Sequence, residues 1–255
     1  MKALFQSLLA AVFAGLLVVT MAPPAAAAWS FADRYDGPQT RASNNRVILT
    51  YDDCPDKTLQ GLRNYKRTIR KAVRMNVAIT IAPLGNCRDY FKRQFGVNIA
   101  DYARQHGQYV ISHSKTHPDL TTLSNRQIRQ ELRCCSASVA SRYVRAPYGS
   151  YDARVLQVMH NMPTPRRLWL WSIDTRDWTG KSQNQVVNHV NRYTRDGDTV
   201  LMHLQWNGFS PRALERMVLG LRQRGHPVCR TYRGADHHSS NPVQTTRHWF
   251  WRMPC

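Results

Sequence analysis

Short apolar runs, rich in β-branched residues, alternate along this chain with longer polar or amphipathic segments. Seven runs have the length of a buried strand: residues 47–51, 77–82, 109–113, 143–147, 168–173, 199–203 and 228–232. Strands that alternate with helices build a mostly parallel sheet with the helices outside it. We therefore predict an α/β fold of about seven parallel strands, which can close into a barrel or stay open.

Apolar residues at helical spacing predict the helices between these strands. Leu59, Leu62, Ile69 and Val73 form one such stripe, and arginine and lysine cover the rest of that segment. Ser124 and Gln127 have the spacing of a capping box that starts another helix. Further helices are expected around residues 99–103, 155–159, 186–190 and 214–221. Because no linker, repeat or change in composition follows residue 29, one domain over residues 29–255 is the simplest interpretation.

The first 28 residues have the pattern of a secretory signal peptide. Lys2 precedes an apolar run from Leu8 to Met21, and four alanines at 25–28 offer a small-residue cleavage site before Trp29. An uncleaved membrane anchor is the alternative, but the run is shorter than the roughly 20 residues that a span needs. We expect residues 1–28 to be removed, no transmembrane segment after cleavage, and a secreted protein that is extracellular, periplasmic or associated with the cell wall.

Six cysteines lie after the predicted cleavage site, at positions 54, 87, 134, 135, 229 and 255. In an oxidising compartment an even number suggests up to three disulfides, whose pairing the sequence does not determine. Adjacent Cys134 and Cys135 are not expected to pair with each other. A cysteine zinc site is the competing interpretation, but no CxxC spacing is present.

The chain is strongly basic, with 36 Lys+Arg against 16 Asp+Glu and a net charge of +20. Most of the cations are arginines, whose planar fork of donors suits carboxylates and phosphates. A surface of this kind attracts anionic polymers, which include nucleic acid, acidic cell-wall polymer and lipid headgroups. Charge alone does not choose among these partners.

Polar residues gather where the predicted strands end, and ligands of parallel α/β folds bind at that edge. Asp52 and Asp53, His113 with His117, Arg145 before Tyr148, Asp174 before Asp177 and Trp178, and His203 stand at five such ends. Taken singly, each has an ordinary structural explanation as a turn, cap or core residue. Five such groups at one end of the same sheet predict a shared site.

The residue types at these ends suit metal-assisted hydrolysis of an acyl bond. Asp53, His113 and His117 form a ligand set for Zn²⁺ that leaves a position for water. Asp52 could act as general base and His203 as general acid, with Asp174 hydrogen-bonded to the other ring nitrogen of His203. Successive side chains diverge on a strand, so Asp52 and Asp53 can share one site only where the strand turns.

Arg145 and Tyr148 complete the predicted site. The Arg145 cation could hold Asp52 ionised and in place. A backbone N–H near Tyr148 could help to stabilise an oxyanion.

Five ordered motifs resemble those of the polysaccharide deacetylases, the NodB-homology domain or carbohydrate esterase family four. They read TYDDCP at 50–55, HSKTH at 113–117, RAPY at 145–148, DTRDW at 174–178 and LMH at 201–203. The resemblance implies a distorted (β/α) barrel of about seven strands. It also implies a divalent metal, usually zinc, and hydrolysis of N-acetyl groups on GlcNAc-containing glycans, or of O-acetyl groups on xylan.

The resemblance also assigns roles to individual residues. Asp52 would be the base, tethered by Arg145, and His203 the acid with Asp174 as its partner. Asp53, His113 and His117 would bind the metal, and Tyr148 would offer its backbone amide to the oxyanion. Trp178 and Leu201 would line the substrate pocket.

The chain departs from the family pattern at three places, of which Tyr51, in place of the commoner phenylalanine, is the mildest. Cys54 stands where the family usually has glycine, and it could pair with Cys87 or serve as a fourth metal ligand. Leu204 and Gln205 follow the last histidine, where the family often has an acidic residue.

The expected partner is an acetylated glycan such as peptidoglycan or a chitin-type oligosaccharide, with an anionic cell-wall polymer as a docking surface. We expect a monomer that does not act on nucleic acid. A secreted metal-dependent phosphodiesterase or nuclease, and a non-catalytic glycan-binding module, remain as alternatives.

Overall fold

The computed structural model describes residues 45–133, 143–163 and 165–231. Within them a parallel five-stranded sheet has the order β3-β2-β1-β7-β6, and β4 pairs with β5 in a second, two-stranded sheet. The strands are β1 (Ile48–Asp53), β2 (Ile79–Pro83), β3 (Tyr109–Val110), β4 (Tyr143–Val144), β5 (Arg167–Leu168), β6 (Ile173–Asp174) and β7 (Thr199–His203). A parallel bridge between Ser112 and Val144 links the two sheets.

The two outermost strands of the combined order, β5 and β6, follow each other directly in the sequence. Beginning at β5, the order runs through β4, the Ser112–Val144 bridge, β3, β2, β1 and β7 to β6. Residues 169–172 join β5 directly to β6. The expected strand at 168–173 is thus divided into two short strands, one in each sheet. Of the expected strand at 228–232 the structure describes residues 228–231, and these form one bridge, between Val228 and Val47.

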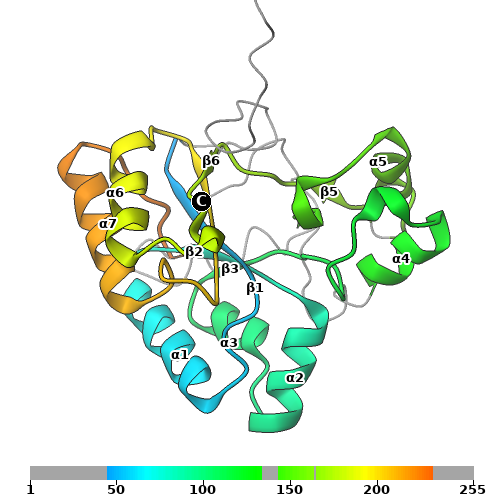
Figure 1. Ribbon diagram of the computed structural model, residues 1–255, viewed down its shortest axis with the longest axis horizontal. Coiled ribbons are helices and arrows are strands. Elements are labelled where there is room, and N and C mark those ends of the chain that lie inside the picture. The colour runs from blue at the N-terminus through cyan, green and yellow to red at the C-terminus, as the bar shows by residue number, and fades with distance from the viewer. Residues whose placement is uncertain (1–44, 134–142, 164, 232–255) are drawn as a thin grey trace, which may run out of the picture.

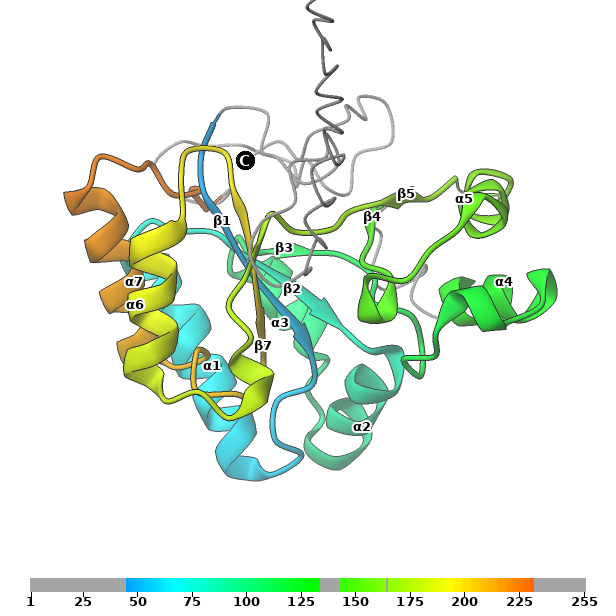
Figure 2. The same cartoon turned by 45° about the horizontal axis from the view of Figure 1, so that its top comes forward.

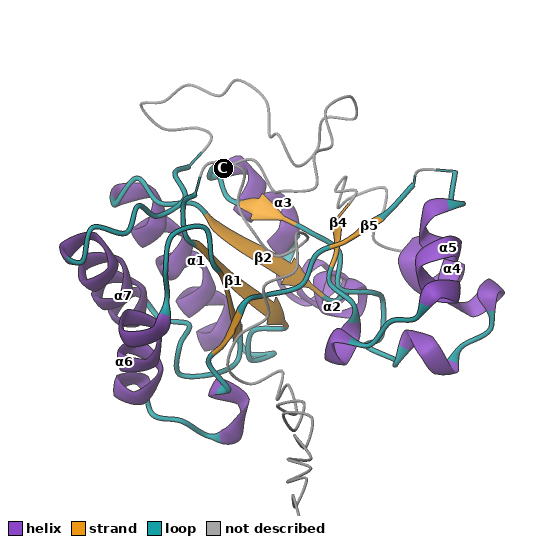
Figure 3. Ribbon diagram, turned by 90° about the horizontal axis from the view of Figure 1, so that it is seen from above, coloured by secondary structure: helices purple, strands orange, loops and turns teal. Residues whose placement is uncertain are grey.

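Helices surround the strands (Figure 3). They are α1 (Leu59–Arg74), α2 (Gly85–Phe95), α3 (Ile99–Gln105), α4 (Asn125–Arg133), α5 (Ala153–His160), α6 (Gln183–Tyr193) and α7 (Pro211–Gln223). The capping box at Ser124 and Gln127 is present, because each backbone N–H donates to the other's side chain. Helix α2 was not among the predicted helices. Its only buried residues are Gly85, Cys87 and Phe91, which is too sparse a stripe to detect.

Two groups of helices pack on different parts of the strand framework (Figures 1 and 2). Helices α1, α7 and α6 lie side by side against the five-stranded sheet, whereas α4 and α5 pack together beside β4 and β5. The largest core cluster joins the sheet to α1, α6 and α7 through apolar residues such as Leu49, Ile69 and Val218. A second cluster fills the α4–α5 region. The described residues therefore form one continuous α/β body.

Several sequence predictions lie outside the described residues. These are the signal peptide at 1–28 and the cysteines at 134, 135 and 255. Within the described residues, none of the helices has the length and apolar character needed to cross a membrane. A disulfide joins Cys54 to Cys87, one of the two roles anticipated for Cys54.

Candidate active site

The sheet register brings the first and last motifs together. Strand β1 pairs with β7 so that Asp52 lies opposite His203, and with β2 so that Asp53 lies opposite Pro83. Residues in register on parallel strands point to the same face of the sheet. Asp52 and His203 are therefore neighbours at the carboxyl end of the sheet, although the strands that carry them, β1 and β7, lie far apart in the sequence.

The backbone of Asp53 lets two consecutive carboxylates face one site. Its φ of 72° lies in the left-handed region, where non-glycine residues are uncommon and often functional. As a result the carboxylates of both Asp52 and Asp53 approach His113. Nε2 of His113 lies 3.8 Å from Oδ2 of Asp52 and 3.4 Å from Oδ1 of Asp53. The turn that Asp52 and Asp53 need in order to share one site is therefore present at Asp53.

His113 and His117 lie on a tightly held loop. Ser114 and His117 both have positive φ, 64° and 69°, and the His117 N–H donates to Oγ of Ser114. Glu131, on α4, accepts the N–H groups of Lys115 and Thr116 at 2.9 Å. Glu131 was not a predicted site residue, because a glutamate on an amphipathic helix gives no sequence signal of this role. Its carboxylate fixes the loop that carries both imidazoles.

The ligand atoms of Asp53, His113 and His117 fit a single metal ion. They lie within 4.8 Å of one another, and Oδ1 of Asp53 is buried without a hydrogen-bond partner. His113 donates from Nδ1 to the carbonyl oxygen of Arg145 at 2.8 Å, which leaves the Nε2 lone pair of the neutral ring facing Asp53. Nε2 of His117 lies 3.6 Å from the same Oδ1. Unpaired acceptors that converge in this way are suited to a divalent cation.

These neighbours also shift the pKa values of the three groups. Burial alone would raise the pKa of Asp53, but its interactions with His113, His203 and Gln205 together outweigh burial and hold the pKa well below its usual range. Burial would lower the pKa of His113, yet the carboxylates of Asp52 and Asp53 raise it. For His117, burial dominates and lowers the pKa. The opposite shifts of Asp53 and His113 therefore share one physical cause, the mutual interaction of a buried carboxylate and a buried imidazole.

Arg145 is fully buried and holds Asp52. Its NH1 lies 3.0 and 3.1 Å from the two carboxylate oxygens of Asp52 and also donates to Oγ1 of Thr50. Its remaining donors bond the carbonyl oxygens of Trp169 and Leu170. Burial lowers the pKa of Arg145, whereas the Asp52 charge opposes that shift. The predicted contact between Arg145 and Asp52 is present.

The partner of His203 is Asp177, and not Asp174 as expected from the sequence. Nδ1 of His203 lies 2.7 Å from Oδ1 of Asp177, and the His203 N–H donates to Oδ2. Burial would lower the pKa of His203, but the hydrogen bond and charge of Asp177 raise it to about 9. Asp174 instead accepts the Arg176 N–H, and burial raises its pKa to about 6. Because residues 174–177 turn after β6, it is the later aspartate that reaches the end of β7.

The three predicted substrate-binding residues have different surroundings. Tyr148 is 68% exposed with φ 59°, and its ring packs edge-on against His117 at 4.5 Å. Trp178 is 52% exposed, directly after Asp177. Leu201 is buried in the cluster shared with α4 and α5. Tyr148 and Trp178 thus present aromatic surface to solvent, whereas Leu201 contributes to packing.

A parallel α/β fold with a carboxylate, two imidazoles and a paired aspartate and histidine at its strand ends has the arrangement of a hydrolase active site. The polysaccharide deacetylase family model matches residues 39–165. This match covers the first three of the five motifs. The chain belongs to the polysaccharide deacetylase family.

Characterised relatives act on several acetylated glycans. The chain is 27% identical to the peptidoglycan-N-acetylglucosamine deacetylase of Bacillus cereus over 206 residues, which is 76% of this chain and 69% of that protein. It is 32% identical to a chitooligosaccharide deacetylase of Rhizobium leguminosarum bv. phaseoli, over 37% of this chain and 43% of that protein. It is 26% identical to a bifunctional xylanase/xylan deacetylase of Cellvibrio japonicus, over 70% of this chain and 26% of that protein.

Solved structures share the fold. A family 4 carbohydrate esterase from Streptomyces lividans, in complex with acetate, superposes with a TM-score of 0.61 at 23% identity, over 73% of this chain and 92% of that one. A family 4 pseudoenzyme from Bacillus anthracis superposes with a TM-score of 0.61 at 25% identity, over 73% of this chain and 64% of that one. Because one of these neighbours is a pseudoenzyme, the shared fold alone does not establish activity, and the residues at the site decide it.

Proposed function

We propose that this protein is a secreted, zinc-dependent deacetylase that hydrolyses N-acetyl groups on GlcNAc-containing glycans of the peptidoglycan or chitin-oligosaccharide type. The observation that carries the proposal is that Asp52 and His203 lie opposite each other at the ends of the adjacent strands β1 and β7. Asp52 is held by a buried arginine, His203 is held by a buried aspartate, and both lie beside the Asp53–His113–His117 set. The glycan class is supported by what the relatives from Bacillus cereus and Rhizobium are named for.

Each group has a role that its environment favours. When bound by Asp53, His113 and His117, a divalent ion supplies Lewis-acid polarisation of the acyl carbonyl and makes water easier to ionise. Asp52, held in place by Arg145, takes a proton from the attacking water. The backbone N–H of Tyr148 is available to the oxyanion. Protonated His203 gives its proton to the leaving nitrogen as the C–N bond breaks, which releases acetate and a free amine.

Acetate release by wild type and Asp52→Asn tests this assignment. Substrates are N-acetylated chitooligosaccharide, peptidoglycan and acetylxylan, because the Cellvibrio relative makes O-deacetylation the specific alternative. We expect the variant to lose about 10²–10⁴-fold in rate, the usual contribution of a general base. Full activity in the variant would contradict the mechanism. Release from acetylxylan alone would assign O-deacetylation, and cleavage of DNA or RNA that a chelator abolishes would assign a phosphodiesterase.

Export is tested by the N-terminus of the mature protein. If residues 1–28 are a signal peptide, protein recovered from the culture medium or the periplasm begins at Trp29. N-terminal sequencing or intact mass measures this directly. Recovery of the full chain from the membrane fraction would contradict the prediction.

We also propose that an anionic cell-wall polymer attracts the enzyme. On α1 the exposed residues Arg63, Arg67, Arg70 and Arg74 follow one another at intervals of four, three and four, which places them on one helical face. Helix α1 contains no acidic residue. A row of like charges does not stabilise a helix, and it supports an interaction with negative charge outside the protein.

A further inference from the structure

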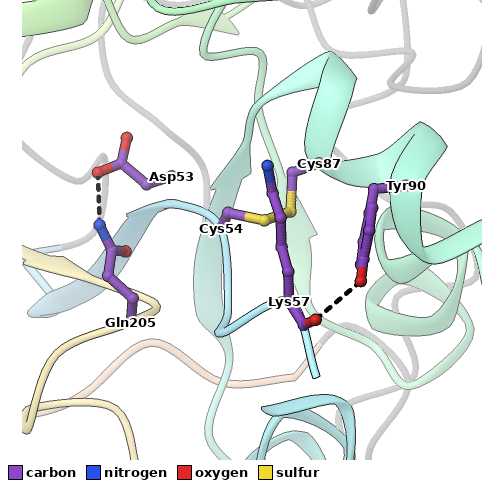
Figure 4. The surroundings of a disulfide bond; sticks show 6 residues. All are labelled: Asp53, Cys54, Lys57, Cys87, Tyr90 and Gln205. Atoms are coloured by element: carbon purple, nitrogen blue, oxygen red, sulfur yellow. Dashed lines mark hydrogen bonds between the residues drawn. A yellow bond between two sulfur atoms is a disulfide. The ribbon is translucent and has the colours of Figure 1, made fainter. Parts of the chain in front are cut away.

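The two carboxylate oxygens of Asp53 have different surroundings. Oδ2 accepts a hydrogen bond from Nε2 of Gln205 at 3.1 Å (Figure 4). Oδ1 is buried, has no hydrogen-bond partner, and faces Nε2 of both His113 and His117. The Gln205 amide therefore determines which oxygen of Asp53 is turned toward the imidazoles.

Gln205 reaches Asp53 because Leu204 is anchored. Leu204 is 3% exposed within the main core cluster, and its N–H donates to the carbonyl oxygen of Asp52 at 2.9 Å. This hydrogen bond continues the pairing of β7 with β1 by one residue. The side chain that follows is then delivered beside Asp53. The burial of the Leu204 side chain and this backbone hydrogen bond together fix the residue that precedes Gln205.

On its other side Asp53 is attached to the histidine loop through the disulfide. Cys54, the next residue, is bonded to Cys87 in the first turn of α2 (Figure 4). The segment just before Cys87 contacts both parts of the site. The Leu84 N–H donates to the carbonyl oxygen of Asp53, whereas the Gly85 and Asn86 N–H groups donate to the carbonyl oxygens of Ser114 and Lys115. Residues 84–87 thus connect the end of β1 to the loop that carries His113 and His117.

We infer that Gln205 and the Cys54–Cys87 disulfide are positioning elements for the metal ligands. Gln205 orients the Asp53 carboxylate, and the disulfide holds its backbone in register with the two histidines. Both act through Asp53, whose left-handed backbone requires outside support. The inference rests on the proposed metal dependence.

The first test compares Gln205→Met with Asn207→Leu in the full mature chain. Asn207 lies in the same loop and also donates from a side-chain amide, but its acceptor is the carbonyl oxygen of Lys181. Zinc affinity is measured by competition with a chromophoric chelator, and the visible spectrum of the Co²⁺ form reports ligand geometry. We expect Gln205→Met to bind zinc about 10–100-fold more weakly and to alter the Co²⁺ spectrum. Asn207→Leu should change neither.

The second test removes the disulfide through the double variant Cys54→Ala/Cys87→Ala. This variant needs no thiol reductant, which would itself bind zinc. We expect a tenfold or greater loss of zinc affinity at a temperature where the protein remains folded. Val158→Ala, at a buried position of α5, lowers stability away from the site and should leave the affinity unchanged.

The outcomes separate the inference from the function that it assumes. If wild type does not bind a divalent metal, the proposed function is wrong. If wild type binds zinc and both the Gln205 and the cysteine variants bind it equally well, the positioning roles are wrong. If the cysteine variant does not fold, the Gln205 comparison decides alone.

Discussion

Consecutive aspartates at the end of β1 have separate partners. Asp52 contacts a permanently charged arginine, which suits a carboxylate that must accept a proton and lose it again. Asp53 contacts two imidazoles and a neutral amide, which suits a carboxylate that binds a cation. The left-handed backbone at Asp53 brings both side chains to one site.

Replacing Asp177 by asparagine should move the alkaline limb of the pH–activity profile to lower pH. Asp177 raises the pKa of His203 to about 9, so the ring is protonated at neutral pH and acts as an acid until the pH passes that value. In Asp177→Asn the limb should shift toward the ordinary histidine pKa near 6.5. Acetate release measured against pH gives this shift.

Asp174→Asn is the matched control, because Asp174 bonds Arg176 instead of His203. A shift in Asp174→Asn, with none in Asp177→Asn, would contradict the pairing. The same interaction links stability to pH. A raised histidine pKa contributes its full stabilisation below the unfolded value, and this contribution is lost as the pH rises through about 9.

At the scale of elements, the site is built on turns that follow short strands. Residues with positive φ occur at four of these strand ends: Asp53 as the last residue of β1, His117 in the loop after β3, Tyr148 after β4 and Arg176 after β6. Such conformations persist where surrounding contacts stabilise them. Here these contacts include the hydrogen bonds to Glu131 and the Cys54–Cys87 disulfide. The helices supply these contacts and set the loop positions.

Gly149→Ala should destabilise the turn after β4. Gly149 has φ +69°, and a Cβ there would lie 2.8 Å from the Trp171 ring. We expect a loss of roughly 2–4 kcal/mol in unfolding free energy, from left-handed strain together with the clash. Acetate release should also fall, because Tyr148 is the preceding residue. Urea unfolding measures the first effect.

Gly96→Ala separates the two causes. Gly96 has nearly the same φ, +67°, but a Cβ there meets nothing within 4 Å. It should lose only about 1–2 kcal/mol, the cost of a left-handed alanine. Equal losses in the two variants would show that the Trp171 ring moves away from the added Cβ at no cost in unfolding free energy.

For the whole molecule, a charge of +20 governs encounters with polymers and has little influence on the fold. The row of arginines on α1 concentrates part of this positive charge on one helical face. Exposed charges are screened beyond about 8–10 Å at physiological salt. Salt should therefore weaken docking on a charged wall and leave hydrolysis of short neutral oligosaccharides unaffected.

Replacing the four arginines on α1 by glutamine should reduce the rate on cell-wall fragments and weaken its dependence on salt. The matched control replaces four exposed arginines elsewhere, Arg126, Arg192, Arg195 and Arg212, so that net charge changes equally. The rate on chitooligosaccharide should stay the same in both variants. Equal effects of the two sets on wall fragments would assign the attraction to net charge, and not to α1.

The alternation of strand-like and helical segments determined the α/β class, and the motifs at strand ends determined the residues of the site. These are local patterns, because each depends on the order of residues along one strand or turn. Tertiary structure decided which of two nearby aspartates meets His203, since that depends on the path of the turn after β6 toward β7. It also decided the roles of Glu131, Gln205 and Cys87, because their contacts arise only when distant segments pack together.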